Sequence, residues 1–309
     1  MFKLLAKTMW GWLDTEVRNK QDIVENPDRI NWFRVSPFIG VHLGCFLVFW
    51  VGFSFTALFI ALFLYALRVF TLTGFYHRYF AHRTFKCNRF WTFVFAFIGG
   101  LAVQRGALWW ASHHRHHHQH SDEETDVHSP IRHGFLWSHV LWFLANKNFT
   151  TRYSLIKDWQ KYPELVMLNR YDLVPPLALI LGLLLTGWLL QTFAPQLQTN
   201  PLQLLVWGFF ISTVAVYHVT FSINSLSHTW GKRRYETSDT SRNNWVLALL
   251  TFGEGWHNNH HHYPATVRQG FYWYEIDISY YVLVMLSWLH IVKDLKKIPK
   301  KVLDSEQIS

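Results

Sequence analysis

Histidines dominate the stretch Trp109–Asp126 (WWASHHRHHHQHSDEETD), in which six of eight consecutive residues are histidine. On an α-helix, positions i, i+3 and i+4 share a face because successive residues are about 100° apart. The side chains of His114, His117 and His118 can therefore point three imidazoles at one spot. Three imidazoles directed at one point are a metal-ligand arrangement.

The same spacing occurs again near the C-terminus, in HNNHH (His257, His260 and His261). A pattern found twice favours metal binding over the alternative interpretation, an exposed polar helix face that responds to pH. In the first stretch, two sets of histidines have this spacing: His114, His117 and His118, and also His113, His116 and His117. The spacing alone does not decide between them.

Two further histidine sets follow apolar segments: His77 and His82 in HRYFAH, and His228 in NSLSH. His77 and His82 lie about 140° apart on an ideal α-helix, so we expect them to bridge from a helix end to the following turn rather than to share one face. A lone boundary histidine such as His228 is alternatively a hydrogen-bonded interface residue.

Nine candidate histidines are too many for one ion, since a zinc site needs three or four ligands. Two ions with about five ligands each account for all nine. Iron pairs are the usual choice for oxygen activation among first-row metals that accept imidazole. Nearby acids are expected to balance charge or orient imidazoles, or else are ordinary solvated residues. They are Asp122, Glu123, Glu124, Asp126 and Glu254.

The composition indicates a membrane protein. Half of the 309 residues are hydrophobic and only 16% are charged, against roughly 25% in typical globular proteins. The net charge of +9 is unevenly placed, because residues 35–67 and 171–231 contain no Lys or Arg. This asymmetry predicts that the basic blocks face the cytoplasm. No nucleic-acid-binding motif occurs, so we expect no nucleic-acid partner.

The apolar runs predict an all-α integral membrane fold with four transmembrane helices in two hairpins. We expect a single domain over residues 1–309, with a cytoplasmic helical cap formed by 75–170 and 224–295 that carries a dimetal site. An amphipathic interfacial helix is expected within residues 1–20, and a basic tail at 293–309. The expected spans are 36–52, 54–74, 173–193 and 202–222.

HRYFAH, HRHHH and HNNHH, in this order, resemble the three histidine boxes of the membrane fatty-acyl desaturases, of the delta-9 acyl-CoA (stearoyl-CoA-type) group. The similarity also includes SHVLWFL, NSLSH and GEGWHNNHH and covers roughly residues 30–295. Ser112 and His113 stand where animal acyl-CoA enzymes have an Arg-Asp pair that holds the CoA head group. The sequence is therefore more similar to the bacterial branch, whose members act on acyl-CoA, acyl-carrier protein or acyl lipids.

The resemblance implies two non-haem iron ions at the cytoplasmic side of four transmembrane helices. The family's box has Arg directly after its first histidine, so Arg115 selects the register that begins at His114. Asn224 matches a position that reaches one iron through a water molecule. The implied histidine ligands are His77, His82, His114, His117, His118, His228, His257, His260 and His261.

The resemblance also implies the reaction: an O2-dependent insertion of a cis double bond, with delta-9 expected, into an acyl thioester or acyl lipid. An external donor such as ferredoxin or cytochrome b5 supplies two electrons, and a bacterial inner membrane is the expected location. In the family, side chains on the second transmembrane helix close the acyl tunnel, and Ala61 and Tyr65 occupy the matching positions. Other expected substrate contacts are Arg105, Trp109, Trp110, Phe221 and Trp256.

Two other functions are consistent with parts of this sequence. A related diiron membrane hydroxylase or acetylenase would use the same ligands, and only its product distinguishes it. A histidine-rich metal transporter or metal buffer would place ionisable ligands within its membrane crossings. Nearly all the histidines here lie outside the expected crossings, which favours the enzyme.

Overall fold

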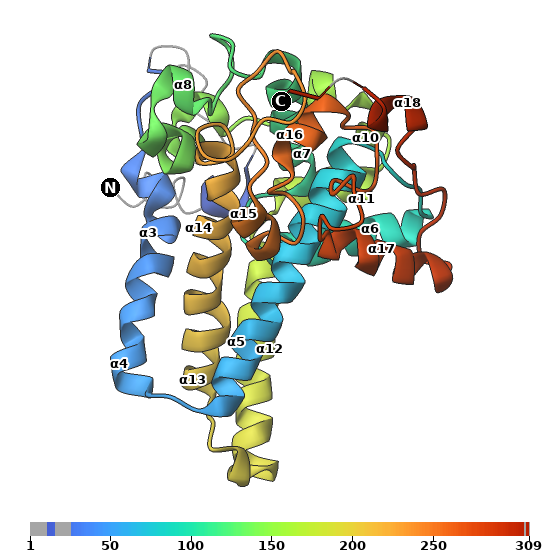
Figure 1. Ribbon diagram of the computed structural model, residues 1–309. Coiled ribbons are helices and arrows are strands. Elements are labelled where there is room, and N and C mark those ends of the chain that lie inside the picture. The colour runs from blue at the N-terminus through green and yellow to red at the C-terminus, as the bar shows by residue number, and fades with distance from the viewer. Residues whose placement is uncertain (1–10, 16–25, 306, 309) are drawn as a thin grey trace.

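Four long apolar helices form a stalk that carries a broader helical cap (Figure 1). The computed structural model describes residues 11–15, 26–305 and 307–308. The amphipathic helix expected within residues 1–20 falls largely outside these residues. The described chain is helical, and its only β-pairing is a set of isolated antiparallel bridges.

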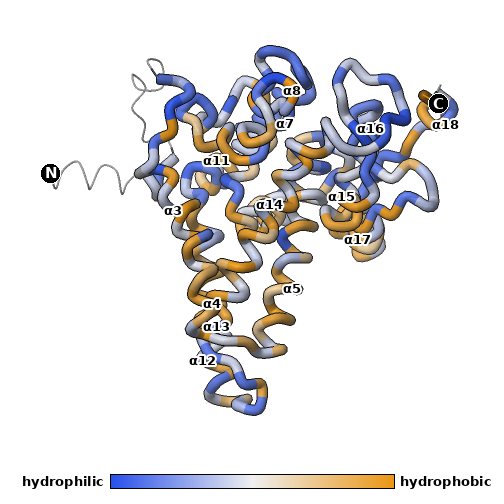
Figure 2. Tube along the Cα trace, turned by 60° about the vertical axis from the view of Figure 1, so that its left-hand side comes forward, coloured by the Kyte–Doolittle hydropathy of each residue, from blue (hydrophilic) through white to orange (hydrophobic). Residues whose placement is uncertain are grey.

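The four membrane helices are Arg34–Val51, Phe55–Ala81, Val174–Phe193 and Pro201–Ser225. Their lengths of 18, 27, 20 and 25 residues reach or exceed the lower limit of about 17 residues for a transmembrane helix. Figure 2 shows the stalk as mainly hydrophobic and the far side of the cap as hydrophilic. The fold is therefore that of an all-α membrane protein, as expected from the sequence.

The stalk consists of two hairpins with tight outer turns. Their elements are α3 (Trp32–Gly44), η1 (Cys45–Leu47), α4 (Val48–Val51) and α5 (Phe55–Phe70), then α12 (Val174–Phe193), η6 (Pro195–Leu197), α13 (Pro201–Leu205), η7 (Val206–Ile211) and α14 (Ser212–Ser225). In the first turn, Ser54 caps α5 by accepting a hydrogen bond from the Ala57 N–H at 3.1 Å. This bond satisfies one of the free N–H groups of the new helix.

The cap is built from short helices between and after the hairpins. They are η2 (Thr71–Ala81), α6 (Arg89–Gly100), α7 (Ala107–His120), α8 (Pro130–His133), η3 (Trp137–Leu141), α9 (Trp142–Leu144), η4 (Asn146–Asn148), η5 (Tyr153–Leu155), α10 (Lys157–Gln160), α11 (Pro163–Arg170), α15 (Trp245–Leu250), α16 (His257–His262), α17 (Ile278–Trp288) and α18 (Lys300–Leu303). The largest buried apolar cluster packs η2 against α6, α7 and α17. The core therefore holds the helix that bears His77 and ends directly before His82.

A buried cation joins the two hairpins inside the stalk. Arg68 is fully buried, and its guanidinium donates to the hydroxyl of Thr213 at 2.6 Å and to the carbonyl of Gly208 at 3.1 Å. Gly208 lies in the π-helical segment η7, where the hydrogen-bond pattern is shifted. The hydrogen bonds of Arg68 stabilise its charge and fix α5 against α14 below the cap.

Candidate metal centre

Five histidines from four segments converge in the first of two clusters beneath the cap surface. They come from η2, the residue that follows it, α7 and α16, so three sequence-distant helices build one site. Their ligand nitrogens all lie within 4.8 Å of one another. The members of this five-histidine cluster are His77, His82, His114, His118 and His260.

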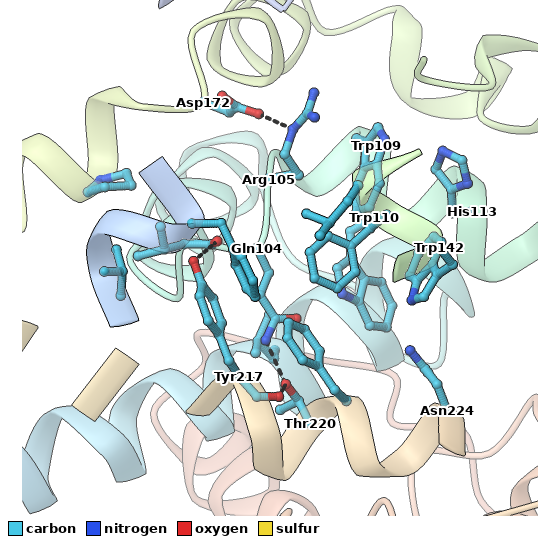
Figure 3. Close-up of a pocket in the computed structure, with 18 of the residues that line it drawn as sticks. Gln104, Arg105, Trp109, Trp110, His113, Trp142, Asp172, Tyr217, Thr220 and Asn224 are labelled. Carbon is cyan, nitrogen blue, oxygen red and sulfur yellow. Dashed lines mark hydrogen bonds and ion pairs between the residues drawn. The ribbon is translucent and has the colours of Figure 1, made fainter. Parts of the chain in front are cut away.

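A second cluster holds four histidines with the same 4.8 Å limit. The Nε2 atom of His228 lies 3.1 Å from that of His257. Asn224, four residues before His228 on α14, lines the adjoining cavity, and Figure 3 shows its side chain projecting toward it. The members of this four-histidine cluster are His117, His228, His257 and His261.

The two copies of the i, i+3, i+4 pattern divide their histidines between the clusters. On α7, His114 and His118 enter the five-histidine cluster and His117 enters the other. On α16, His257 and His261 enter the four-histidine cluster, whereas His260 enters the first. The expectation of three imidazoles at one spot was therefore wrong. Positions i and i+4 differ by only about 40° around a helix, but i+3 and i+4 differ by about 100°.

The first histidine pair bridges from the end of a helix to the following turn, as expected from the sequence. The segment η2 is π-helical, and the N–H of His82 donates to the carbonyl of His77, five residues earlier, at 3.1 Å. His82 itself lies in the turn directly after η2. The two ring centroids lie 4.8 Å apart.

Three other histidines, in or beside the HRHHH and HNNHH motifs, lie outside the two clusters. Nε2 of His113 lies 3.0 Å from the carbonyl oxygen of Thr150, and the His113 ring packs on Trp109. His116 packs beside His120, and His262 contacts the hydroxyl of Ser305 at 3.0 Å. The structure therefore contains the register that begins at His114.

Most of the clustered imidazoles are held in their neutral form. Burial and the neighbouring histidines hold the pKa values of His82, His114 and His118 well below the usual range. His257 and His260 are shifted in the same direction by the same causes. Neutral imidazole is the form that binds a metal ion.

Four carboxylates orient the rings from outside. The Asp126 carboxylate lies 3.0 Å from Nδ1 of His117, and that of Asp122 lies 3.1 Å from Nδ1 of His228. Such contacts fix the tautomer and direct Nε2 into the cluster. Glu254 contacts Nδ1 of His77, and Asp239 contacts Nδ1 of His261.

These acids differ in part from those expected from the sequence. Asp122, Asp126 and Glu254 act as anticipated, whereas Glu123 pairs with the exposed His120 and Glu124 is exposed. Asp239 was missed, because nothing in its polar loop sets it apart from a solvated acid. The missed Gln269, whose amide lies 3.2 Å from Nδ1 of His77, also had no signal in the sequence.

Asp126 and His117 form a coupled buried pair. Burial lowers the pKa of His117, but the adjacent Asp126 outweighs burial and the net pKa is raised. For Asp126 burial favours the neutral acid, yet His117 and His128 outweigh it and the pKa is lowered. The four-histidine cluster therefore carries one favourable proton that a bound cation has to displace.

The donor set fits a pair of cations. Nε2 of His260 lies 3.0 Å from Nε2 of His77 and 2.9 Å from that of His118. One ring nitrogen makes a single hydrogen bond, so these contacts cannot all be satisfied by protons. Nε2 of His261 is buried without a hydrogen-bond partner in the described chain. Lone pairs that converge in this way are what a metal ion requires.

A cavity of about 440 Å³ adjoins both clusters, and Figure 3 shows part of its lining. Its wall includes His77, His114, His117 and His257 at the metal centre. Apolar residues from α3, α12 and η7 line the part within the stalk, namely Val41, Leu177, Ile180 and Phe209. The cavity therefore extends from the histidines into the stalk and is mainly apolar.

The expected substrate residues are divided between this cavity and other places. Arg105, Trp109, Trp110 and Phe221 line the cavity, and Trp110 stacks on His114 with centroids 4.9 Å apart. The lining does not include the other three residues. Ala61 is buried in the stalk, the Tyr65 hydroxyl donates to the Leu250 carbonyl at 2.8 Å, and the Trp256 indole donates to the Ile276 carbonyl at 2.8 Å.

The fold and site define a helical membrane protein with paired histidine clusters beside an apolar cavity. The sequence model of the fatty acid desaturase family matches residues 49–290. The chain is 39% identical over 261 residues to delta-9 acyl-lipid desaturase 1 of Arabidopsis thaliana, which covers 83% of this chain and 80% of that protein. It is 34% identical over 277 residues to the sn-1 stearoyl-lipid 9-desaturase of Anabaena variabilis, covering 88% and 96%.

A third relative, an acyl-CoA 5-desaturase of Anemone leveillei, is 36% identical over 267 residues, covering 85% of this chain and 78% of that protein. The chain therefore belongs to the fatty acid desaturase family. It is a membrane-bound fatty-acyl desaturase, and a diiron mechanism is the general property of this family.

Proposed function

We propose that this protein binds two iron ions and uses O2 to insert a double bond into a saturated acyl chain. The five-histidine cluster holds one iron, and the four-histidine cluster holds the other with Asn224 as a ligand through water. The division of nine histidines into two adjacent groups is the observation that carries this proposal. Residues 1–309 then act as one membrane-embedded domain.

The bound irons supply the oxidising power that no side chain provides. Overall, two C–H hydrogens, one O2, two external electrons and two protons give a double bond and two water molecules. The chain's own residues supply position and exclude water. Trp110 stacks on His114 at the cavity wall, so an acyl chain there lies directly beside the cluster. Each buried methylene contributes about 0.8 kcal/mol to binding.

A membrane lipid is the proposed acyl carrier, with acyl-CoA and acyl-carrier protein as alternatives. The polar lining residues Arg34 and Asp172 lie where α3 and α12 enter the membrane. Arg105 donates to Asp172 at 2.7 Å and lies over the Trp109 ring. An acyl chain in the cavity therefore keeps its polar head at the level of the lipid head groups. The names of the first two relatives above also refer to acyl lipids.

The regiochemistry and location are proposed from resemblance. The relatives' names place their double bonds at positions 9 and 5, and we propose a cis bond at position 9. The uneven distribution of Lys and Arg supports a cytoplasmic metal centre, in a bacterial inner membrane. An external donor, a ferredoxin or cytochrome b5, supplies the electrons. Phe221 and Trp109 complete the acyl contacts.

Expression in a host that lacks unsaturated fatty acids tests the function directly. We expect the parent chain to produce monounsaturated lipids whose double bond maps to position 9. A His117→Ala variant, expressed to the same level, is the matched negative control. Hydroxylated products instead of alkenes would identify a diiron hydroxylase. Unsaturated lipids formed equally by the His117→Ala variant would contradict the assignment of the metal centre.

A further inference from the structure

The five-histidine cluster is the more exposed of the two clusters. His82, His114 and His118 are partly exposed, whereas the four-histidine cluster has only His261 partly exposed. Electron transfer between proteins becomes faster as the path shortens. Of the three partly exposed histidines in this cluster, His82 and His118 are absent from the cavity lining, so a donor outside the cap approaches the metal centre through them.

Cationic side chains directly follow two of these ligands. Arg83 follows His82, and Arg115 follows His114. The Arg115 guanidinium donates to the Ala81 carbonyl at 2.9 Å, which fixes it beside the end of η2. Asp158 of α10 accepts from Arg115 at 2.8 Å and from Arg83 at 3.0 Å. Helix α10 therefore covers the outer side of both ligand segments.

The surface around α10 carries an excess of positive charge. We name it the α10 face. Its two acids are already paired, Asp158 with two arginines and Glu164 with Arg89 at 2.7 Å. Lys157 and Lys161 are exposed and form no ion pair with any other described residue. The five cations of the α10 face are Arg83, Arg89, Arg115, Lys157 and Lys161.

Aromatic rings contact three of these cations. Arg83 lies 4.2 Å from the ring centroid of the buried Trp159. Arg89 and Lys161 lie 5.5 and 5.4 Å from the centroid of the Tyr162 ring. Such cation–π contacts hold long side chains in place. The charges are therefore positioned on a structured surface.

We propose that the α10 face binds an acidic one-electron carrier protein and delivers its electrons to the five-histidine cluster. The inference rests on the proposed function, because each turnover needs two electrons from outside the chain. Two reduced carriers are each oxidised by one electron, and O2 takes up these electrons with two protons and the two hydrogens of the acyl chain. The α10 face is separate from the cavity, since its five cations are absent from the cavity lining.

Binding measurements on the full chain in lipid nanodiscs test the docking surface. The probes are an acidic [2Fe–2S] ferredoxin and an acidic cytochrome b5, titrated at several ionic strengths. The Lys157→Glu/Lys161→Glu variant reverses two charges of the α10 face. The matched control reverses two exposed lysines of α18, in Lys300→Glu/Lys301→Glu.

We expect the α10 variant to bind at least one of the carriers about 10-fold more weakly or worse, with a flatter dependence on salt. The control should match the parent. The proposal is overturned if both carriers bind parent and α10 variant equally, or if the α18 variant shows the larger loss.

A single-turnover assay separates this proposal from the proposed function. Protein that has been reduced chemically beforehand is given O2 and substrate, so no carrier is needed. Equal product from the parent and the α10 variant, together with weak carrier binding by the variant, supports the docking surface. A parent that binds two irons yet forms no double bond overturns the proposed function, and with it the role given to the α10 face.

Discussion

The backbone N–H of His82 donates to the carbonyl of His77 at 3.1 Å, across five residues instead of four. This π-type contact closes the end of η2 and brings the ring of His82, in the following turn, within 4.8 Å of the ring of His77. It also extends the second membrane helix to Ala81, so His77 lies on the helix and His82 directly after it. Helix geometry inside the membrane protein therefore decides the ligand positions.

Removal of one histidine from either cluster should reduce iron binding. We expect His260→Ala and His257→Ala each to bind about one iron or less per chain and to lose desaturation, because each removes a ligand from a different cluster. Metal analysis of the purified protein measures this. His116→Ala is the control, since His116 lies outside both clusters, and it should retain about two irons. Full iron content in His260→Ala would contradict the assignment.

Loss of the Asp239 carboxylate should weaken metal binding without removing a ligand. Asp239 contacts Nδ1 of His261, so Asp239→Asn no longer fixes the orientation of that ring. We expect about 10- to 100-fold lower iron affinity, measured by competition with a chelator. Glu123→Gln alters an exposed acid whose only ion pair among the described residues is with His120, and it should have no effect. Equal affinities in both variants would exclude a role for Asp239.

Acidification should destabilise the metal-free protein. The pKa values of His82, His114 and His118 are lowered by burial, whereas histidines in the unfolded chain titrate near about 6.5. The unfolded state therefore binds more protons below that pH, and stability falls as pH decreases. The raised pKa of His117 acts in the opposite direction, but six clustered histidines, with His257, His260 and His261 included, have a lowered pKa.

Between about pH 6.5 and 5, the expected loss of stability comes from the histidines. The paired carboxylates lose their contribution to stability only below about pH 4. Unfolding midpoints of metal-free protein at pH 7 and 5.5 measure it. A midpoint that rises on acidification would show that the clustered histidines are not held neutral.

Chain-length preference should locate the end of the acyl cavity. The sequence hypothesis is that Tyr65 limits chain length, so Tyr65→Ala should shift products to longer chains. Ile180 lines the cavity about two helical turns into α12, and Ile180→Phe should shift products to shorter chains by filling that space. Gas chromatography of the lipids measures both. An unchanged profile for Tyr65→Ala beside a shifted one for Ile180→Phe would rule out the role of Tyr65.

Gly99 should not tolerate a side chain. A Cβ at this position would overlap the ring of the buried Tyr76, the residue before His77. We expect Gly99→Ala to lose about 1–3 kcal/mol of stability, seen as a lower thermal unfolding midpoint in detergent. Gly40→Ala has open space around the new Cβ and should leave the midpoint unchanged or slightly higher. Equal midpoints would show that Tyr76 moves freely.

The sequence by itself determined the membrane class, the four apolar helices and the histidines that enter the clusters. These features are local, because hydropathy and residue spacing are properties of neighbouring positions. The HRHHH pattern alone left two registers open, and the resemblance to the family's motif selected the one that begins at His114. The family follows from the same ordered motifs.

Only the tertiary structure decided how these histidines are shared between two sites. His117 and His118 are adjacent in the chain yet belong to different clusters, because their directions depend on where α16 and η2 pack around α7. Asp239 lies in a polar loop, and only the packing of that loop brings it to His261. The π-type contact that brings His82 close to His77 likewise depends on a backbone pattern with no simple sequence signal. Contacts between distant segments depend on packing, which residue spacing does not specify.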